Sequence, residues 1–169
     1  MELLPLEDPL METRVPGLRV FRIGPRRPTG LWTYVSVGGW TATQEDGVGL
    51  EFVLAADSDD IRYGNLLGSV VYHHAGPPED RLGLGSIVPI GEPLVEGSEC
   101  DHFLVSLPYP YGPKLKNCEW DGGRAHFLWL LPITGAERLV AMANGVEALE
   151  VLFEQSAFEH WNPRRPSVV

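Results

Sequence analysis

The chain of 169 residues has little cysteine and no long apolar run. Cys100 and Cys118 are its only cysteines, too few for a disulfide framework. The longest uncharged apolar stretch, residues 127–133, is far shorter than the roughly 20 residues of a membrane-spanning helix. The first ten residues carry acidic side chains and two prolines, which is not typical of a secretory signal. These absences predict a protein of the reducing cytoplasm.

Basic side chains are also scarce. The 13 Lys and Arg residues stand against 23 Asp and Glu residues, which gives a formal net charge of −10. This charge repels phosphate backbones and anionic lipids, so we expect neither nucleic acid nor a membrane surface as a partner. A basic protein is a suitable partner, because complementary charge speeds encounter and disfavours wrong partners.

What the chain does contain is a succession of short apolar segments. Residues 18–23, 31–37 and 48–56 are rich in β-branched and aromatic side chains and predict three strands. Apolar residues then recur at helical spacing, which predicts a helix from about Asp59 to His73 with Ser58 as its cap.

The N-terminal part differs from these segments. Residues 1–16 show no sustained period and predict a mobile or loosely docked arm, followed by a single domain at 17–169. Within the predicted helix, Gly64 and Gly68 lie four residues apart and could let another backbone approach closely.

The second half of the chain continues the alternation of apolar runs and turns. It predicts further strands at residues 87–90, 103–107 and 115–120, and a strand buried on both faces at 125–131 that ends at Pro132. Three prolines predict an extended surface loop at 108–113. Thr134 and Glu137 have the spacing of a capping box, so a helix should start there, with a break at Asn144 and Gly145.

Residue types that can bind metals or catalyse reactions are present, but their spacing is not specific. His73, His74, Cys100 and His102 lack the second closely spaced pair of a zinc signature. The acidic run from Asp57 to Asp60 lacks the later glycine and glutamate of a calcium loop. We therefore expect no metal, no cofactor and no catalytic activity. A hydrolase or small-ligand-binding protein that uses a histidine and carboxylate cluster in a cleft is the alternative.

Six residues are candidates for binding a partner. Tyr109 and Tyr111 lie in a proline-stiffened segment, and Trp120 is flanked by Glu119 and Asp121. Each aromatic residue has two interpretations, an interface anchor or a cover for the rim of the core. The carboxylates of Asp57, Asp59 and Asp60 complete the set; they suit a basic partner, while helix capping also explains them.

The order of these segments resembles the suppressor-of-fused domain family. The similarity lies mainly in residues 127–134, in Glu137, in residues 144–149 and in the Pro-x-Arg-x-Ser-Val tail at 163–168; it is weaker over 34–54 and 83–108. Two features depart from the family pattern: the first helical segment expected ahead of the strands is short or missing, and Gly39-Trp40-Thr41 replaces the plainer Gly-x-Ser pattern. The resemblance implies an α+β fold with a mixed, mostly antiparallel sheet flanked by helices, and no known catalytic activity or required cofactor.

The resemblance also implies a function. The animal namesake of the family restrains a transcription factor by binding it, and stand-alone bacterial members resemble immunity proteins. We therefore expect a non-catalytic, bacterial protein-binding module, an immunity protein that neutralises a partner toxin with a basic domain such as a nuclease. Binding by addition of a partner strand to a sheet edge would leave little trace in the sequence.

Overall fold

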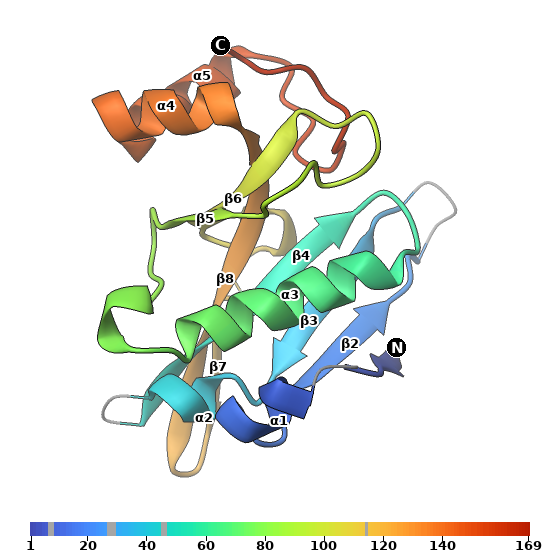
Figure 1. Ribbon diagram of the computed structural model, residues 1–169, viewed down its shortest axis with the longest axis vertical. Helices are drawn as coiled ribbons and strands as arrows, with labels where there is room; N and C mark the ends of the chain where they lie inside the picture. Colours follow the sequence, from blue (N-terminus) through green and yellow to red (C-terminus); the bar gives the residue numbers. More distant parts are fainter. Residues whose placement is uncertain (7–8, 27–29, 45–46, 114) are drawn as a thin grey trace.

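One sheet forms the centre of the molecule (Figure 1). The computed structural model describes residues 1–6, 9–26, 30–44, 47–113 and 115–169. The strands within these ranges are β1 (Glu2–Leu4), β2 (Arg19–Ile23), β3 (Trp32–Val37), β4 (Val48–Ala56), β5 (Ile87–Pro89), β6 (Cys100–Ser106), β7 (Asn117–Trp120) and β8 (Gly123–Thr134). The α-helices are α1 (Pro9–Arg14), α2 (Trp40–Thr43), α3 (Ile61–His74), α4 (Gly135–Asn144) and α5 (Val146–Gln155).

The sheet is mixed. Its strands follow the order β1-β2-β3-β4-β8-β6-β5, and β7 pairs with the first part of β8. β4 and β8 run parallel, while the other pairs of described strands are antiparallel. A parallel pair needs a long crossover connection. Here α3, β5, β6 and β7 all lie between β4 and β8 in the chain. The α+β class with a mixed, mostly antiparallel sheet is confirmed.

Side-chain alternation along the strands produces two cores, one on each face of the sheet. Phe52 and Leu54 of β4 join the core that α3 covers, whereas Val53 joins the core beneath α4 and α5. β8 repeats this division with Leu130 on the α3 side and Leu131 on the other. In Figure 1, α3 crosses the sheet over β3 and β4, and α4 and α5 lie beyond the end of β8.

The predicted end of β8 at Pro132 is wrong. Pairing with β6 continues through Pro132 to Thr134. β4 pairs with β8 only as far as Trp129, so none of the described strands pairs with that side of β8 at Pro132. The carbonyl of Pro132 points to this side and accepts from Arg165 Nη2 at 3.0 Å. A residue without an N–H is therefore tolerated here.

The predicted extended loop at 108–113 is also wrong in part. Residues Tyr109–Tyr111 form a turn of 3₁₀ helix. Tyr111 N donates to Pro108 O at 3.0 Å, and Gly112 N donates to Tyr109 O at 3.2 Å. The proline between the two tyrosines needs no donor, and its fixed φ suits a 3₁₀ turn.

The N-terminal segment is packed, where the sequence predicted a loosely docked arm. β1 pairs with β2, and Leu4, Met11 and Val15 are buried. The glycines of α3 make room for this segment: a Cβ on Gly64 would lie 2.5 Å from Leu4 Cδ1, and one on Gly68 would lie 3.1 Å from Met11 Sδ. Whether an independently folding domain begins at residue 17 stays a prediction.

A buried ion pair fixes the C-terminal tail. In the predicted capping box, Glu137 N donates to Thr134 Oγ1 at 3.2 Å, and Thr134 N donates to the Glu137 carboxylate at 2.9 Å. Arg165 donates to both oxygens of that carboxylate at 2.6 and 2.7 Å, and Val168 N donates at 3.0 Å. Glu137 and Arg165 are both buried. Glu137 and the tail, which are among the residues that resemble the family, therefore join the C-terminus to the start of α4.

Candidate protein-binding sites

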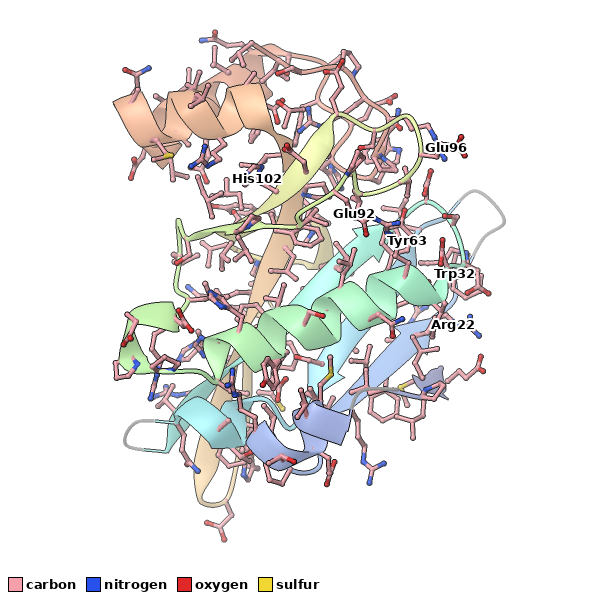
Figure 2. All side chains as sticks on the ribbon, in the orientation of Figure 1. Arg22, Trp32, Tyr63, Glu92, Glu96 and His102 are labelled. Atoms are coloured by element: carbon pink, nitrogen blue, oxygen red, sulfur yellow. The ribbon has the colours of Figure 1, made fainter. Side chains whose placement is uncertain are left out.

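The predicted acidic residues lie where β4 leads into α3, and each has a contact within the chain. Asp60, not Ser58, caps α3, because its side chain accepts from Arg62 N at 2.9 Å. Asp59 forms an ion pair with Arg22 of β2, which Figure 2 labels beside the start of α3. All three carboxylates are nonetheless exposed to solvent.

Asp57 is hydrogen-bonded to the first turn of α3. Its Oδ1 accepts from Ser58 Oγ at 3.1 Å and from Tyr63 Oη at 3.4 Å. Burial, together with the Asp57 charge, raises the pKa of Tyr63 to about 12. The tyrosine hydroxyl therefore stays protonated and remains a donor to this carboxylate.

The two predicted tyrosines occupy different environments. Tyr109 is 65% exposed. Tyr111 packs against the core beneath α4 and α5, its hydroxyl lies 3.2 Å from Thr33 Oγ1, and burial raises its pKa. Tyr111 therefore covers the sheet, and Tyr109 is the tyrosine that a partner can reach.

Trp120 lies near the opposite end of the sheet from the acidic residues. Its ring meets that of Trp40 edge to face at 4.6 Å, and it is 40% exposed. It adjoins the start of β4, whereas Asp57 follows the end of β4; nine residues of strand separate them by roughly 30 Å. The six predicted residues therefore do not form one surface.

A groove between α3 and β5 was not predicted. Its volume is about 270 Å³, and it is lined by Leu66, Ser69, Val70, His73, Val88, Pro89, Ile90 and Phe103. The residues come from one helix and two strands that lie far apart in the sequence. The residue pattern of any one of these segments therefore does not predict the groove.

β5 borders this groove and is the last strand of the sheet. Two of its main-chain bonds to β6 involve even-numbered residues. Val105 N donates to Ser86 O at 2.8 Å, and Ile90 N donates to Asp101 O at 2.9 Å. In a strand, every second residue directs its main-chain groups to the same side. The main-chain groups of Ile87 and Pro89 therefore point away from β6. Pro89 supplies no N–H, as is common for edge strands.

The histidines considered for a metal site do not converge. His73 Nδ1 lies 3.8 Å from Asp80, and His102 Nδ1 lies 2.7 Å from Asp101 Oδ1. Cys100 is buried, and burial raises the pKa of its thiol. Among the residues that the structure describes, no group of three or more His, Cys, Asp or Glu side chains is placed to hold a metal ion.

One cavity contains the residue types of the alternative hypothesis. It has a volume of about 500 Å³, lies between β8, α5 and the C-terminal tail, and is lined in part by Glu150, Glu154 and His160. Burial alone lowers the pKa of His160, whereas a carboxylate in contact would raise it. The structure therefore brings these residues to one cavity without coupling the histidine to an acid.

The fold and these surfaces define a single-sheet α+β protein with an open edge strand, and the comparisons identify its family. The model of the suppressor of fused protein family matches residues 14–166. A suppressor-of-fused homologue from Neisseria gonorrhoeae has 32% sequence identity and a TM-score of 0.85, over 99% of this chain and 87% of that one. The chain belongs to the suppressor-of-fused family.

More distant structures share the fold. The Sufu–Fu complex matches with a TM-score of 0.64 and 18% identity, over 89% of this chain and 76% of that one. Drosophila suppressor of fused matches with a TM-score of 0.63 and 16% identity; the match covers 89% of this chain and 42% of the Drosophila chain. No protein with a curated description matches the sequence. Within the described ranges, none of the helices has the length and apolar character to span a membrane.

Proposed function

We propose that this chain is a non-catalytic protein-binding module, an immunity protein that neutralises a basic toxin. The observation that carries the proposal is the open outer edge of β5 beside the groove under α3. An added strand gains main-chain hydrogen bonds at such an edge, and a neighbouring groove receives its alternate side chains. A fold relative solved as the Sufu–Fu complex is a precedent for binding another protein.

The charge of the chain supports a basic partner. The net charge is −10, and Asp57, Asp59 and Asp60 are exposed at the start of α3. Complementary charge raises the rate of encounter without requiring a particular side-chain contact. Tyr109 and Trp120 are exposed enough to contact a partner, whereas Tyr111 packs on the sheet.

We place this activity in the bacterial cytoplasm. Cys100 and Cys118 are both free thiols, and Cys118 is exposed. An exposed free thiol suits a reducing compartment, where it is not drawn into disulfides.

A hydrolase or small-ligand-binding protein is the second candidate. The observation in its favour is the cavity that Glu150, Glu154 and His160 share. Hydrolysis by a histidine base needs an orienting partner for the imidazole. The ring contacts of His160 within the described residues are to Trp129, Phe158 and Trp161, and none of these is an acid. Protein binding is the function that the geometry supports better.

Affinity capture tests the proposal. The tagged chain is expressed in its own cells, and co-purifying proteins are identified by mass spectrometry at low and at moderate salt. We expect a stoichiometric, basic, toxin-like protein that is released as salt rises, since added ions screen the attraction between exposed charges. Its toxicity should be suppressed by co-expression of the chain. Recovery of the chain alone, carrying a metal or a small molecule, would contradict the proposal.

A further inference from the structure

The cavity between β8, α5 and the tail combines apolar walls with acidic side chains. Its volume of about 500 Å³ lies within the roughly 300–1,000 Å³ of ligand pockets. Half of its lining residues are aromatic or aliphatic: Tyr109, Trp129, Leu131, Phe153 and Phe158. Flat aromatic surfaces of this kind favour an occupant that is itself flat or apolar along part of its length.

Two acids give the cavity a negative charge. Glu150 and Glu154 both line it, and they lie one helical turn apart on the same side of α5. Like charges at this spacing repel each other on a helix. A cation placed between the two carboxylates would replace this repulsion by two attractions.

Trp129 forms a buried wall of the cavity. The residue is 4% exposed, and its Nε1 has no acceptor among the described residues. Buried N–H groups nearly always have a partner, because leaving one unpaired costs free energy. The nitrogen itself is enclosed by the protein, and the His160 ring lies edge to face against Trp129 at 5.1 Å, so an occupant of the cavity contacts the indole ring and not this N–H.

The positive groups near the cavity do not oppose a cation. The Arg165 guanidinium lies over Phe158, 4.5 Å from the ring centre, but the buried Glu137 carboxylate already pairs with it. Burial lowers the pKa of His160, so its imidazole is neutral at pH 7. The acids of α5 therefore determine the sign of the charge here.

We propose that this cavity binds an arginine side chain of the partner protein. The guanidinium is held by Glu150 and Glu154, and its flat face and alkyl chain pack on the aromatic walls, the Trp129 ring among them. Arginine fits better than lysine, because its planar group both stacks on rings and donates to two carboxylates at once. The inference rests on the proposed function and adds a contact on the face of the sheet opposite the α3 groove.

A pair of peptides tests this inference on the intact chain. The first is an acetylated and amidated Gly-Ser-Arg-Ser-Gly peptide, and the second replaces arginine by citrulline, whose urea group is nearly the same shape but neutral. Binding is followed by the NMR signal of the Trp129 indole N–H, assigned with Trp129→Phe. We expect the arginine peptide to shift this signal saturably, with an affinity about tenfold higher than that of the citrulline peptide.

Charge-neutral variants locate the contact. Glu150→Gln with Glu154→Gln should lower the affinity for the arginine peptide about tenfold, since both carboxylates lose their charge. Glu99→Gln removes one exposed charge outside the cavity and should leave the affinity unchanged. Unaltered spectra of the remaining residues confirm that the variants are folded.

Three results would overturn the inference. Equal affinity for the citrulline peptide would show that the cavity binds the apolar part of the peptide and not its charge. A Trp129 shift that depends on protein concentration alone would show that a second copy of the chain occupies the cavity. No shift would show that arginine does not enter the cavity. Capture of a basic partner together with any of these results rejects the cavity contact alone. Arginine binding without a basic partner rejects the proposed function instead.

Discussion

At the scale of single residues, the Glu137–Arg165 pair has the largest expected effect on stability. The two residues lie 28 positions apart, and their side chains are 0% and 4% exposed. Removing one partner of a buried pair leaves the other charge without compensation in a medium of low polarity. The pair therefore couples the tail to the start of α4.

The corresponding prediction is a loss of stability in Glu137→Gln. This change keeps the shape of the side chain and removes its charge, so we expect the free energy of unfolding to fall by about 3–5 kcal/mol. Urea denaturation measures it, with Glu99→Gln on the surface as the control, which should change it by less than about 0.5 kcal/mol. A loss below about 1 kcal/mol would show that the pair does not hold the tail.

His74 makes stability depend on pH. It is 3% exposed, and its Nδ1 accepts from Leu82 N at 2.9 Å. Burial, with smaller contributions from Arg81 and His73, lowers its pKa from 6.5 to about 4. The unfolded chain thus binds a proton below about pH 6.5, while the folded chain binds it only near pH 4. Stability must fall as pH drops through this window.

The size of this effect can be measured with His74→Asn, which keeps an acceptor for Leu82 N. Each pKa unit corresponds to about 1.4 kcal/mol, so His74 should account for at most about 3 kcal/mol of stability lost between pH 6.5 and 4. Urea denaturation across this range should show a clearly shallower pH dependence in His74→Asn than in the wild type, and only a small change in His73→Asn, since burial of His74 is the larger cause of its lowered pKa. Identical pH dependence in all three proteins would exclude His74 as the cause.

At the scale of elements, α1 packs against α3 through one of its faces. Met11 is 8% exposed and lies against Gly68 of α3, whereas the adjacent Leu10 is 61% exposed. The glycines of α3, unfavourable for a helix, are explained by this close approach. The N-terminal segment therefore contributes to the stability of the whole sheet.

This contact predicts opposite results for two neighbouring changes. Met11→Ala should lower the free energy of unfolding by about 2–5 kcal/mol, because it leaves a cavity over α3. Leu10→Ala should change it by less than about 0.5 kcal/mol, because its side chain is mostly in solvent. Denaturation by urea distinguishes them. Equal, small effects would mean that the segment is a loosely docked arm, as the sequence alone predicted.

The elements themselves are largely visible in the sequence, because their signals are local. Period-two alternation marked β2, β3 and β4, and the Thr134–Glu137 capping box marked the start of α4. Features that depend on which strand lies next to a segment could not be predicted from the sequence of that segment. Pro132 appeared to end a strand, since the sequence does not show that β4 has already separated from β8 at that point.

At the scale of the whole molecule, the candidate sites depend on which strands become neighbours. The sequence indicated acidic and aromatic residues by type, and the structure distributes them over both ends of β4 and both faces of the sheet. The open edge of β5 follows from strand order, and the cavity proposed to bind arginine combines side chains from β8, α5 and the tail. Each site combines residues from segments that are distant in the sequence, so the residue pattern of a single segment does not predict it.

The most direct test of partner binding compares Ile87→Pro with Ile87→Ala. Both remove the Ile87 side chain, but only proline removes the N–H that points out from β5, while the bonds to β6 are kept. The affinity for the captured partner is measured by calorimetry after thermal unfolding has shown that both variants are folded. Strand addition at β5 predicts that Ile87→Pro binds at least about tenfold more weakly than Ile87→Ala. Equal affinities of the two variants would contradict binding through this edge.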